Sequence, residues 1–232
     1  VTETDPLGRS TTRRFDAVGR VVQVIDPALA AAHYEYDAFG NLLKTRDVNG
    51  TETVLTYDVR GLRRSISDPS AGYWSFDYFP SGELKSQINA RGQVVSFTYD
   101  RLSRLTARIE PEGTTTWVWG TSAANRNVGS LAAVSAPGFH ESYQYDSYGR
   151  PSVVNRTAAG YTMVSQQTYD GATGLPDVFG YPQATGAERL RVRHHFDRGR
   201  LARVSDADSG ATYWQLNGVD ALGLVSDETL GN

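Results

Sequence analysis

Few residues of this 232-residue chain have types and spacings that could carry out chemistry. Regularly spaced aspartates could supply the paired carboxylates of a glycoside hydrolase, although the sequence does not show their separation in space. His194 and His195 could bind a metal, but neighbouring residues of a strand face opposite sides. Asp206-Ala-Asp-Ser-Gly210 has the start of a calcium loop, but its glycine comes one position early and no bidentate glutamate follows at the required distance. These patterns favour a protein without a metal, a cofactor or a catalytic residue.

Aromatic side chains offer a second kind of site. Tryptophans at four positions could form a platform that stacks on sugars, and Trp117 and Trp119 share the strand face that is polar elsewhere in the chain. The four are Trp74, Trp117, Trp119 and Trp214. The competing interpretation is that they pack against neighbouring loops. A carbohydrate- or surface-binding module therefore stays open as the alternative function, with no ligand-binding residues assigned.

The aspartates have a simpler explanation, because they belong to an internal repeat. An aromatic residue recurs every 21 positions in the first half of the chain and less regularly in the second half. These repeat aromatics are Phe15, Tyr36, Tyr57, Tyr78, Tyr99, Tyr145, Tyr169 and Phe196. In most units an aspartate follows the aromatic, and a second aspartate follows about ten residues later.

Both aspartates begin predicted turns. Aspartate at the first position can accept a hydrogen bond from the backbone N–H two residues on, and glycine at the fourth position can adopt the left-handed conformation that closes a hairpin. Leu29 and Ala71 replace that glycine, which predicts looser or shifted turns, with Gly72 as a substitute; Ser103 also breaks the glycine column. The predicted turn residues are Asp5, Gly8, Asp16, Gly19, Asp26, Asp37, Gly40, Asp47, Gly50, Asp58, Gly61, Asp68, Gly92 and Gly113.

The segments between turns are about six or seven residues long, which suits strands and is too short for helices. We expect an all-β fold: one continuous, curved antiparallel sheet of short, hairpin-linked strands. Residues 1–232 form a single array, regular over 1–120 and irregular, with longer loops, over 121–232. Later second turns are predicted at Ala159-Gly160, Thr185-Gly186 and Asp208 to Gly210.

Strand faces follow from the period of two. The repeat aromatics lie on an apolar face, together with the residues two positions before them, such as Tyr34 and, in the 113–119 segment, Val118. The intervening strands contribute Val21, Leu42, Leu84 and Leu105 to this face. Arg63 occupies the same column once, where it needs a partner or meets water.

Composition excludes several classes of protein. The net charge is −3 with both signs interspersed, so no nucleic-acid surface is indicated. No apolar stretch reaches the roughly 20 residues that span a membrane, and the chain contains no cysteine. The first residue is not Met, and we expect a piece of a longer protein. Its exposed sheet edges predict self-association.

The repeat resembles the tyrosine–aspartate (YD) repeat of the Rhs family of bacterial toxins and surface proteins. The match is carried by Asp5-Pro-Leu-Gly-Arg9, Tyr36-Asp-Ala-Phe-Gly-Asn41, Tyr57-Asp58, Tyr99-Asp100 and Tyr145-Asp-Ser-Tyr-Gly-Arg150. The resemblance implies a secreted or surface-located β-shell that encloses a C-terminal toxin. The expected partners are the rest of that shell and its cargo.

One segment is similar to the motif at which shells of this family cleave themselves. Asp220-Ala-Leu-Gly-Leu224 matches the D-P-x-G-L pattern, but it lacks the proline and falls in phase with the repeat. It therefore favours an ordinary hairpin turn.

Overall fold

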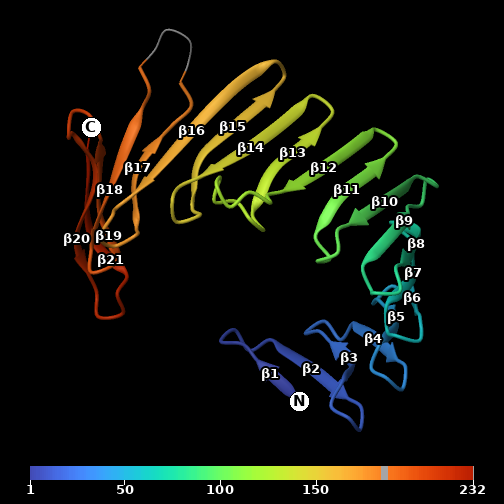
Figure 1. Cartoon of the computed structure of the whole chain (residues 1–232). Helices are drawn as coiled ribbons and strands as arrows, with labels where there is room; N and C mark the ends of the chain where they lie inside the picture. The colour runs from blue at the N-terminus through green and yellow to red at the C-terminus, as the bar shows by residue number, and fades with distance from the viewer. Residues whose placement is uncertain (184–187, 232) are drawn as a thin grey trace. The chain divides into compact units, whose positions relative to one another are not determined.

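The computed structural model describes residues 1–183 and 188–231, and every regular element in them is a β-strand (Figure 1). All 21 strands are assigned to one antiparallel sheet. The predicted all-β fold of short, hairpin-linked strands is confirmed. None of the described segments is a helix long and apolar enough to cross a membrane. The chain divides into two compact units, Val1–Gly113 and Thr114–Asn232.

Each strand of the first unit pairs with the next strand along the chain, so sequence order is also spatial order (Figure 1). Its strands are β1 (Thr2–Thr4), β2 (Ser10–Phe15), β3 (Val21–Ile25), β4 (Ala31–Tyr36), β5 (Leu42–Arg46), β6 (Glu52–Tyr57), β7 (Arg63–Asp68), β8 (Gly72–Tyr78), β9 (Leu84–Ile88), β10 (Val94–Tyr99) and β11 (Leu105–Glu110).

The second unit has the same meander, with longer strands in its middle. Its strands are β12 (Gly113–Trp119), β13 (Leu131–Ala136), β14 (Phe139–Tyr145), β15 (Pro151–Ala158), β16 (Tyr161–Tyr169), β17 (Pro176–Gly180), β18 (Arg191–Asp197), β19 (Arg200–Asp206), β20 (Thr212–Val219) and β21 (Val225–Leu230). The turn predicted at Thr185-Gly186 lies outside the described residues.

A bulge marks each repeat aromatic. The register shifts between Thr98 and Tyr99, and equivalent shifts precede Phe15, Tyr36, Tyr57, Tyr78 and Tyr145. The extra residue arises because a four-residue turn whose last position has positive φ joins its strands through a bulge. The bulge sets the aromatic opposite the first residue of the next strand, as Tyr99 is opposite Leu105.

The sheet is a single layer. In β6, half-buried Thr53, Leu55 and Tyr57 alternate with exposed Val54 and Thr56. Among the described residues, Val178 and Val192 are the apolar residues that are almost fully buried, and no large side chain is fully buried. Stability must therefore come mainly from contacts between neighbouring hairpins, as in other repeat arrays.

Leu29 does not loosen its turn, contrary to the sequence prediction, and Ser103, which also replaces the glycine, closes a turn of the same kind. Leu29 adopts φ 67° and Ser103 adopts φ 59°. The N–H of Leu29 donates to the Asp26 carbonyl at 3.0 Å, as glycine does in the other turns. The side chains of Leu29 and Ser103 are exposed, so nothing crowds them, and the surrounding hydrogen bonds hold the left-handed conformation. At Ala71 the predicted shift occurs, because Gly72 takes φ 76°.

Gly113 is a second correction. It is the first residue of β12 with φ 147°, rather than a turn residue in the left-handed helical region. Pro111 and Glu112 alone form a shorter turn between β11 and β12. Gly92, by contrast, has φ 76° in a turn that begins at Asn89.

The tryptophans of β12 are the third correction. Trp119 pairs with Leu131 across a bulge, as Tyr99 pairs with Leu105, so Trp119 is the repeat aromatic of its unit. Trp117 and Trp119 are half-buried, whereas Val118 is 53% exposed. Val118 therefore lies on the opposite face from the one predicted. The prediction was wrong because Trp119 follows Tyr99 by 20 residues, whereas the earlier repeat aromatics are 21 residues apart.

Both alternatives predicted for Arg63 apply, because the residue is exposed and also has an aromatic partner. Its guanidinium lies 4.7 Å from the ring centroid of Phe76, and its carbonyl accepts the hydroxyl of Tyr78 at 3.0 Å. Val21, Leu42, Leu84 and Leu105 are half-buried opposite the repeat aromatics.

Candidate functional site

The aspartate that follows most of the repeat aromatics makes several hydrogen bonds within its own turn. In the turn after β2, Asp16 Oδ1 accepts the N–H groups of Val18 at 3.0 Å and Arg20 at 2.9 Å, and Oδ2 accepts Arg20 Nε at 2.7 Å. The Asp16 carbonyl accepts the N–H of Gly19 at 3.1 Å. One residue thus holds both ends of the turn, which explains why the repeat places aspartate there.

The same pair of backbone donors, two and four residues on, binds further aspartates at both the first and the second turns of the repeat. They are Asp5, Asp26, Asp37, Asp47, Asp58, Asp100, Asp146 and Asp220. Asn89 accepts the equivalent N–H groups, and at the turn after β8 Phe79 takes the first position without a carboxylate. Asp220 therefore forms an ordinary repeat turn, as the sequence favoured.

At seven of these aspartates the hydrogen bonds favour the ionised carboxylate and lower its pKa. The N–H of Arg20, with its guanidinium, lowers the pKa of Asp16 below the ordinary 3.8. The pKa is lowered likewise at Asp5, Asp37, Asp47, Asp58, Asp100 and Asp146. A general acid at neutral pH needs a raised pKa, so these carboxyl groups suit turn formation and not acid catalysis.

Three other turns use the aspartate differently. At Asp68, Asp170 and Asp206 the carboxylate accepts N–H groups two and three residues on, and a glycine with positive φ closes the turn one position later. Asp206 is the most strongly bound, because it also accepts the hydroxyls of Ser209 at 2.9 Å and Tyr213 at 2.9 Å. The loop that begins at Asp206 is thus a hairpin turn.

Acid should weaken the Asp206 turn over a defined range. The N–H and hydroxyl of Ser209 and the hydroxyl of Tyr213 hold the pKa of Asp206 at about 2, against an ordinary 3.8. A lowered folded-state pKa contributes stability above pH 3.8, which is lost as the pH falls from 3.8 through about 2. We expect the urea midpoint of Asp206→Asn to fall less steeply over this range than that of wild type. Equal slopes would contradict the assignment.

The tyrosine hydroxyl explains why most repeat aromatics are tyrosine. Tyr99, at the end of β10, donates to the carbonyl of Leu84 at the start of β9, at 3.0 Å. Equivalent bonds join Tyr36 to Val21, Tyr78 to Arg63, Tyr145 to Leu131 and Tyr169 to Pro151, at 2.6–3.1 Å. Phe15 and Phe196 lack the hydroxyl. These five tyrosines therefore connect their hairpins to the ones before them.

Arginine connects the turns in the opposite direction. Arg20, bound to its own Asp16, lies 5.0 Å from the Tyr36 ring centroid and donates to the Asp37 carbonyl at 2.9 Å. Arg150 does the same from Asp146, with its guanidinium 4.1 Å from the Tyr169 ring centroid and a bond to the Gly174 carbonyl at 3.2 Å. Sequence analysis missed this role, although the arginine recurs four residues after the aspartate.

The remaining candidates take part in local contacts. His194 Nδ1 lies 3.3 Å from the Asp177 carbonyl, and His195 Nε2 lies 2.9 Å from the Ser205 hydroxyl. Burial and the guanidinium of Arg203 lower the pKa of His195. Residues 1–183 and 188–231 contain no group of three or more side chains that could hold a metal. Trp74 and Trp214 donate to the Ala71 carbonyl at 3.1 Å and to Glu228 at 2.7 Å.

One carboxylate outside the turns is nearly buried. Glu141 is 8% exposed and binds the Tyr143 hydroxyl and the Arg156 guanidinium. Burial, and then the hydrogen bond and charge of Glu141, raise the pKa of Tyr143 to about 12. We expect Glu141→Gln to lower that pKa towards 10 in an ultraviolet titration of the tyrosinates. Tyr99→Phe, which leaves this cluster intact, is the control; a Tyr143 pKa unchanged by Glu141→Gln would contradict the assignment.

Hairpins of fixed register, each held by a turn aspartate and connected to its neighbours by tyrosine and arginine, define an antiparallel β-repeat protein. The profile of the RHS Repeat matches residues 1–29, 34–72 and 80–115. These segments of the chain therefore carry RHS repeats, as the resemblance predicted.

Two known proteins are similar over almost the whole chain. Double-stranded DNA deaminase toxin A from Burkholderia cenocepacia (strain H111) is 28% identical over 246 residues, covering 94% of this chain and 15% of that toxin. The crystal structure of TcdB2-TccC3 matches with a TM-score of 0.50 at 13% identity, covering 94% of this chain and 14% of that chain. The present chain thus spans only about a seventh of each relative, and the second likeness concerns the fold.

Proposed function

We propose that the chain is a wall segment of a secreted protein shell that encloses a toxin cargo, and that it works without catalysis. The observation that carries this proposal is that the turn carboxylates are engaged by their own hairpins and have lowered pKa values. A sheet whose hairpins repeat similar contacts can be extended by adding further hairpins, which suits a wall. The function as a structural repeat module follows from the fold and the family.

The enclosing role is supported by the single-layer sheet and by the relatives. An apolar face with almost no fully buried side chain offers surface against which a partly folded polypeptide can lie. One relative is a toxin, and a continuous wall can exclude proteases from what it encloses. The partners under this proposal are further repeat segments and the cargo, outside the cell that makes them.

Limited proteolysis tests the enclosing role. The gene product that contains this chain, with the residues that follow it, is treated with protease alongside the same downstream residues expressed alone. We expect the downstream segment to survive in the complete product under conditions that digest it alone. Tyr99→Ala, which weakens the wall between two hairpins, should reduce the protection. Digestion at equal rates in both forms would overturn the proposal.

A further inference from the structure

The arginine connections between successive turns are interrupted after β4. After β8 the equivalent position is Glu83, which instead accepts the Ser103 hydroxyl of the next turn. Arg20 spans from the turn after β2 to the turn after β4. From the turn after β6, Arg60 spans to the next turn, where it donates to the carbonyls of Phe79 at 3.2 Å and Pro80 at 2.8 Å. Between these two connections, at the position equivalent to Arg20, the chain has Asn41. Its side chain lies beside Gly61 of the next turn, where a Cβ would come 3.4 Å from Asn41 Oδ1, but its amide donates to Asp37 of its own turn and not to the Asp58 carbonyl.

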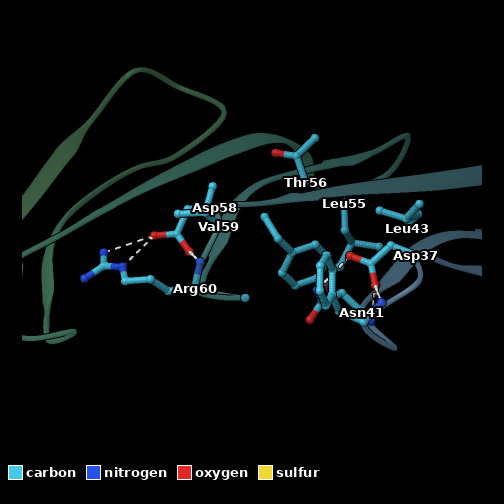
Figure 2. A pocket seen from close by; sticks show the side chains of 11 residues that line it. Asp37, Asn41, Leu43, Leu55, Thr56, Asp58, Val59 and Arg60 are labelled. Atoms are coloured by element: carbon cyan, nitrogen blue, oxygen red, sulfur yellow. Dashed lines mark hydrogen bonds and ion pairs between the residues drawn. The ribbon is translucent and has the colours of Figure 1, made fainter.

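A pocket lies at this gap. It has a volume of about 600 Å³ and is open to solvent, and both turns line it, with Asp37 and Asn41 from one and Asp58 and Arg60 from the other. Figure 2 shows Asn41 bound to Asp37 on one side, while Arg60 extends from the far side of Asp58. The pocket thus occurs where the repeat would place a guanidinium and the sequence does not supply one.

The groups that hold Arg20 have counterparts in the pocket. Arg20 lies against the Tyr36 ring, and the Asp37 carbonyl accepts both Arg20 Nη1 and the N–H of Gly40. The equivalent groups are the Tyr57 ring and the Asp58 carbonyl. In the described part of the chain, no cation lies against Tyr57, and the Asp58 carbonyl accepts only the N–H of Gly61.

The charge of the pocket also favours a cation. Asp58 is paired with Arg60 at 3.0 Å, but Asp37 Oδ2 accepts only the neutral amide of Asn41, at 2.7 Å. One carboxylate therefore lacks a cationic partner within hydrogen-bonding distance among the described residues. A planar guanidinium matches a ring face and a carbonyl oxygen together better than an ammonium does.

We propose that this pocket binds the guanidinium of an arginine presented by another polypeptide segment. The guanidinium lies against the Tyr57 ring and donates to the Asp58 carbonyl. Arg20 makes the equivalent contacts with Tyr36 and Asp37 in the preceding repeat. Phe39 and Val59 flank the pocket and are 93% and 105% exposed, so they can pack against apolar residues on either side of the bound arginine. This inference does not depend on the enclosing role of the chain.

The test is a nuclear magnetic resonance titration that follows the Tyr57 ring and the Gly61 amide. The probes are acetyl-arginine amide, acetyl-lysine amide and the capped tripeptide Leu-Arg-Leu. We expect the arginine amide to bind in roughly the millimolar range, the tripeptide several-fold more tightly, and the lysine amide several-fold more weakly. Equal binding of lysine and arginine would overturn the guanidinium assignment, and equal binding of tripeptide and arginine amide would overturn the polypeptide partner.

Two variants complete the test. Asn41→Arg supplies the missing guanidinium from within the chain and should weaken tripeptide binding at least about tenfold. Asn125→Arg adds the same charge at an exposed site in the second unit and should leave binding unchanged. If Asn41→Arg does not fold, Arg20→Asn opens the equivalent gap at Tyr36 and should create a second site for acetyl-arginine amide. Unchanged binding in Asn41→Arg, or no new site in Arg20→Asn, would overturn the proposal.

Discussion

Tyr99→Ala is expected to lower the free energy of unfolding by about 3 kcal/mol. The tyrosine ring covers part of the apolar face, its hydroxyl donates to the Leu84 carbonyl at 3.0 Å, and it contacts Phe79 edge to face with centroids 6.2 Å apart. The variant loses all three contacts at the junction between two hairpins. Urea denaturation followed by tryptophan fluorescence measures the change.

Two further variants separate the ring from its hydroxyl. Tyr99→Phe retains the ring and should cost about 1 kcal/mol, because the Leu84 carbonyl then loses a donor. Tyr161 is 76% exposed, and Tyr161→Phe should change stability by less than about 0.5 kcal/mol. A cost for Tyr99→Ala no larger than that for Tyr161→Phe would show that the hairpins do not rely on this connection.

Asp16→Ala is the second substitution that we expect to lower the stability of the fold strongly. It removes the acceptor of the Val18 and Arg20 N–H groups and of Arg20 Nε, and it frees the guanidinium that contacts Tyr36 and Asp37. Two turns are therefore weakened by one substitution. We expect the midpoint of thermal unfolding to fall by several degrees, with faster amide exchange at Val18 and at Gly40.

Two further substitutions, Asp16→Asn and Asp227→Ala, serve as controls for Asp16→Ala. Asp16→Asn retains one acceptor oxygen and should lose much less stability, because Asn89 accepts the N–H groups of Arg91 and Gln93 at 2.9 and 3.0 Å in a native turn. Asp227 is exposed on β21, and its side chain makes no hydrogen bond or ion pair with other described residues, so Asp227→Ala should be neutral. Equal losses for Asp16→Ala and Asp227→Ala would refute the turn-locking role.

Periodicity allowed most of the fold to be predicted. A turn signal every 10 or 11 residues leaves room only for strands, and aspartate and glycine at fixed offsets locate the hairpins. Positive φ at Leu29 and Ser103 could not be predicted from residue type, because the surrounding hydrogen bonds outweigh the steric cost of a side chain there. The repeat therefore determines backbone conformation more strongly than the individual residue does.

The side-chain contacts between successive hairpins were harder to predict than the hairpins themselves. The aromatic role of Trp119 was hidden by one missing residue in the spacing, which reversed the predicted strand faces of β12. The pocket beside Asn41 depends on how far arginines from neighbouring turns extend, and spacing alone does not give that distance. Sequence analysis located the turns but not the side chains that bridge them.

The most direct test of the account is a carboxyl ¹³C titration of every aspartate and glutamate in the folded protein. Because backbone N–H groups bind the turn carboxylates, Asp5, Asp16, Asp37, Asp47, Asp58, Asp100 and Asp146 should all titrate below 3.8 and return to that value in urea. Turn aspartates that titrate at 3.8 in the folded state, or one raised well above it as in a catalytic acid, would contradict a structural wall built on locked turns.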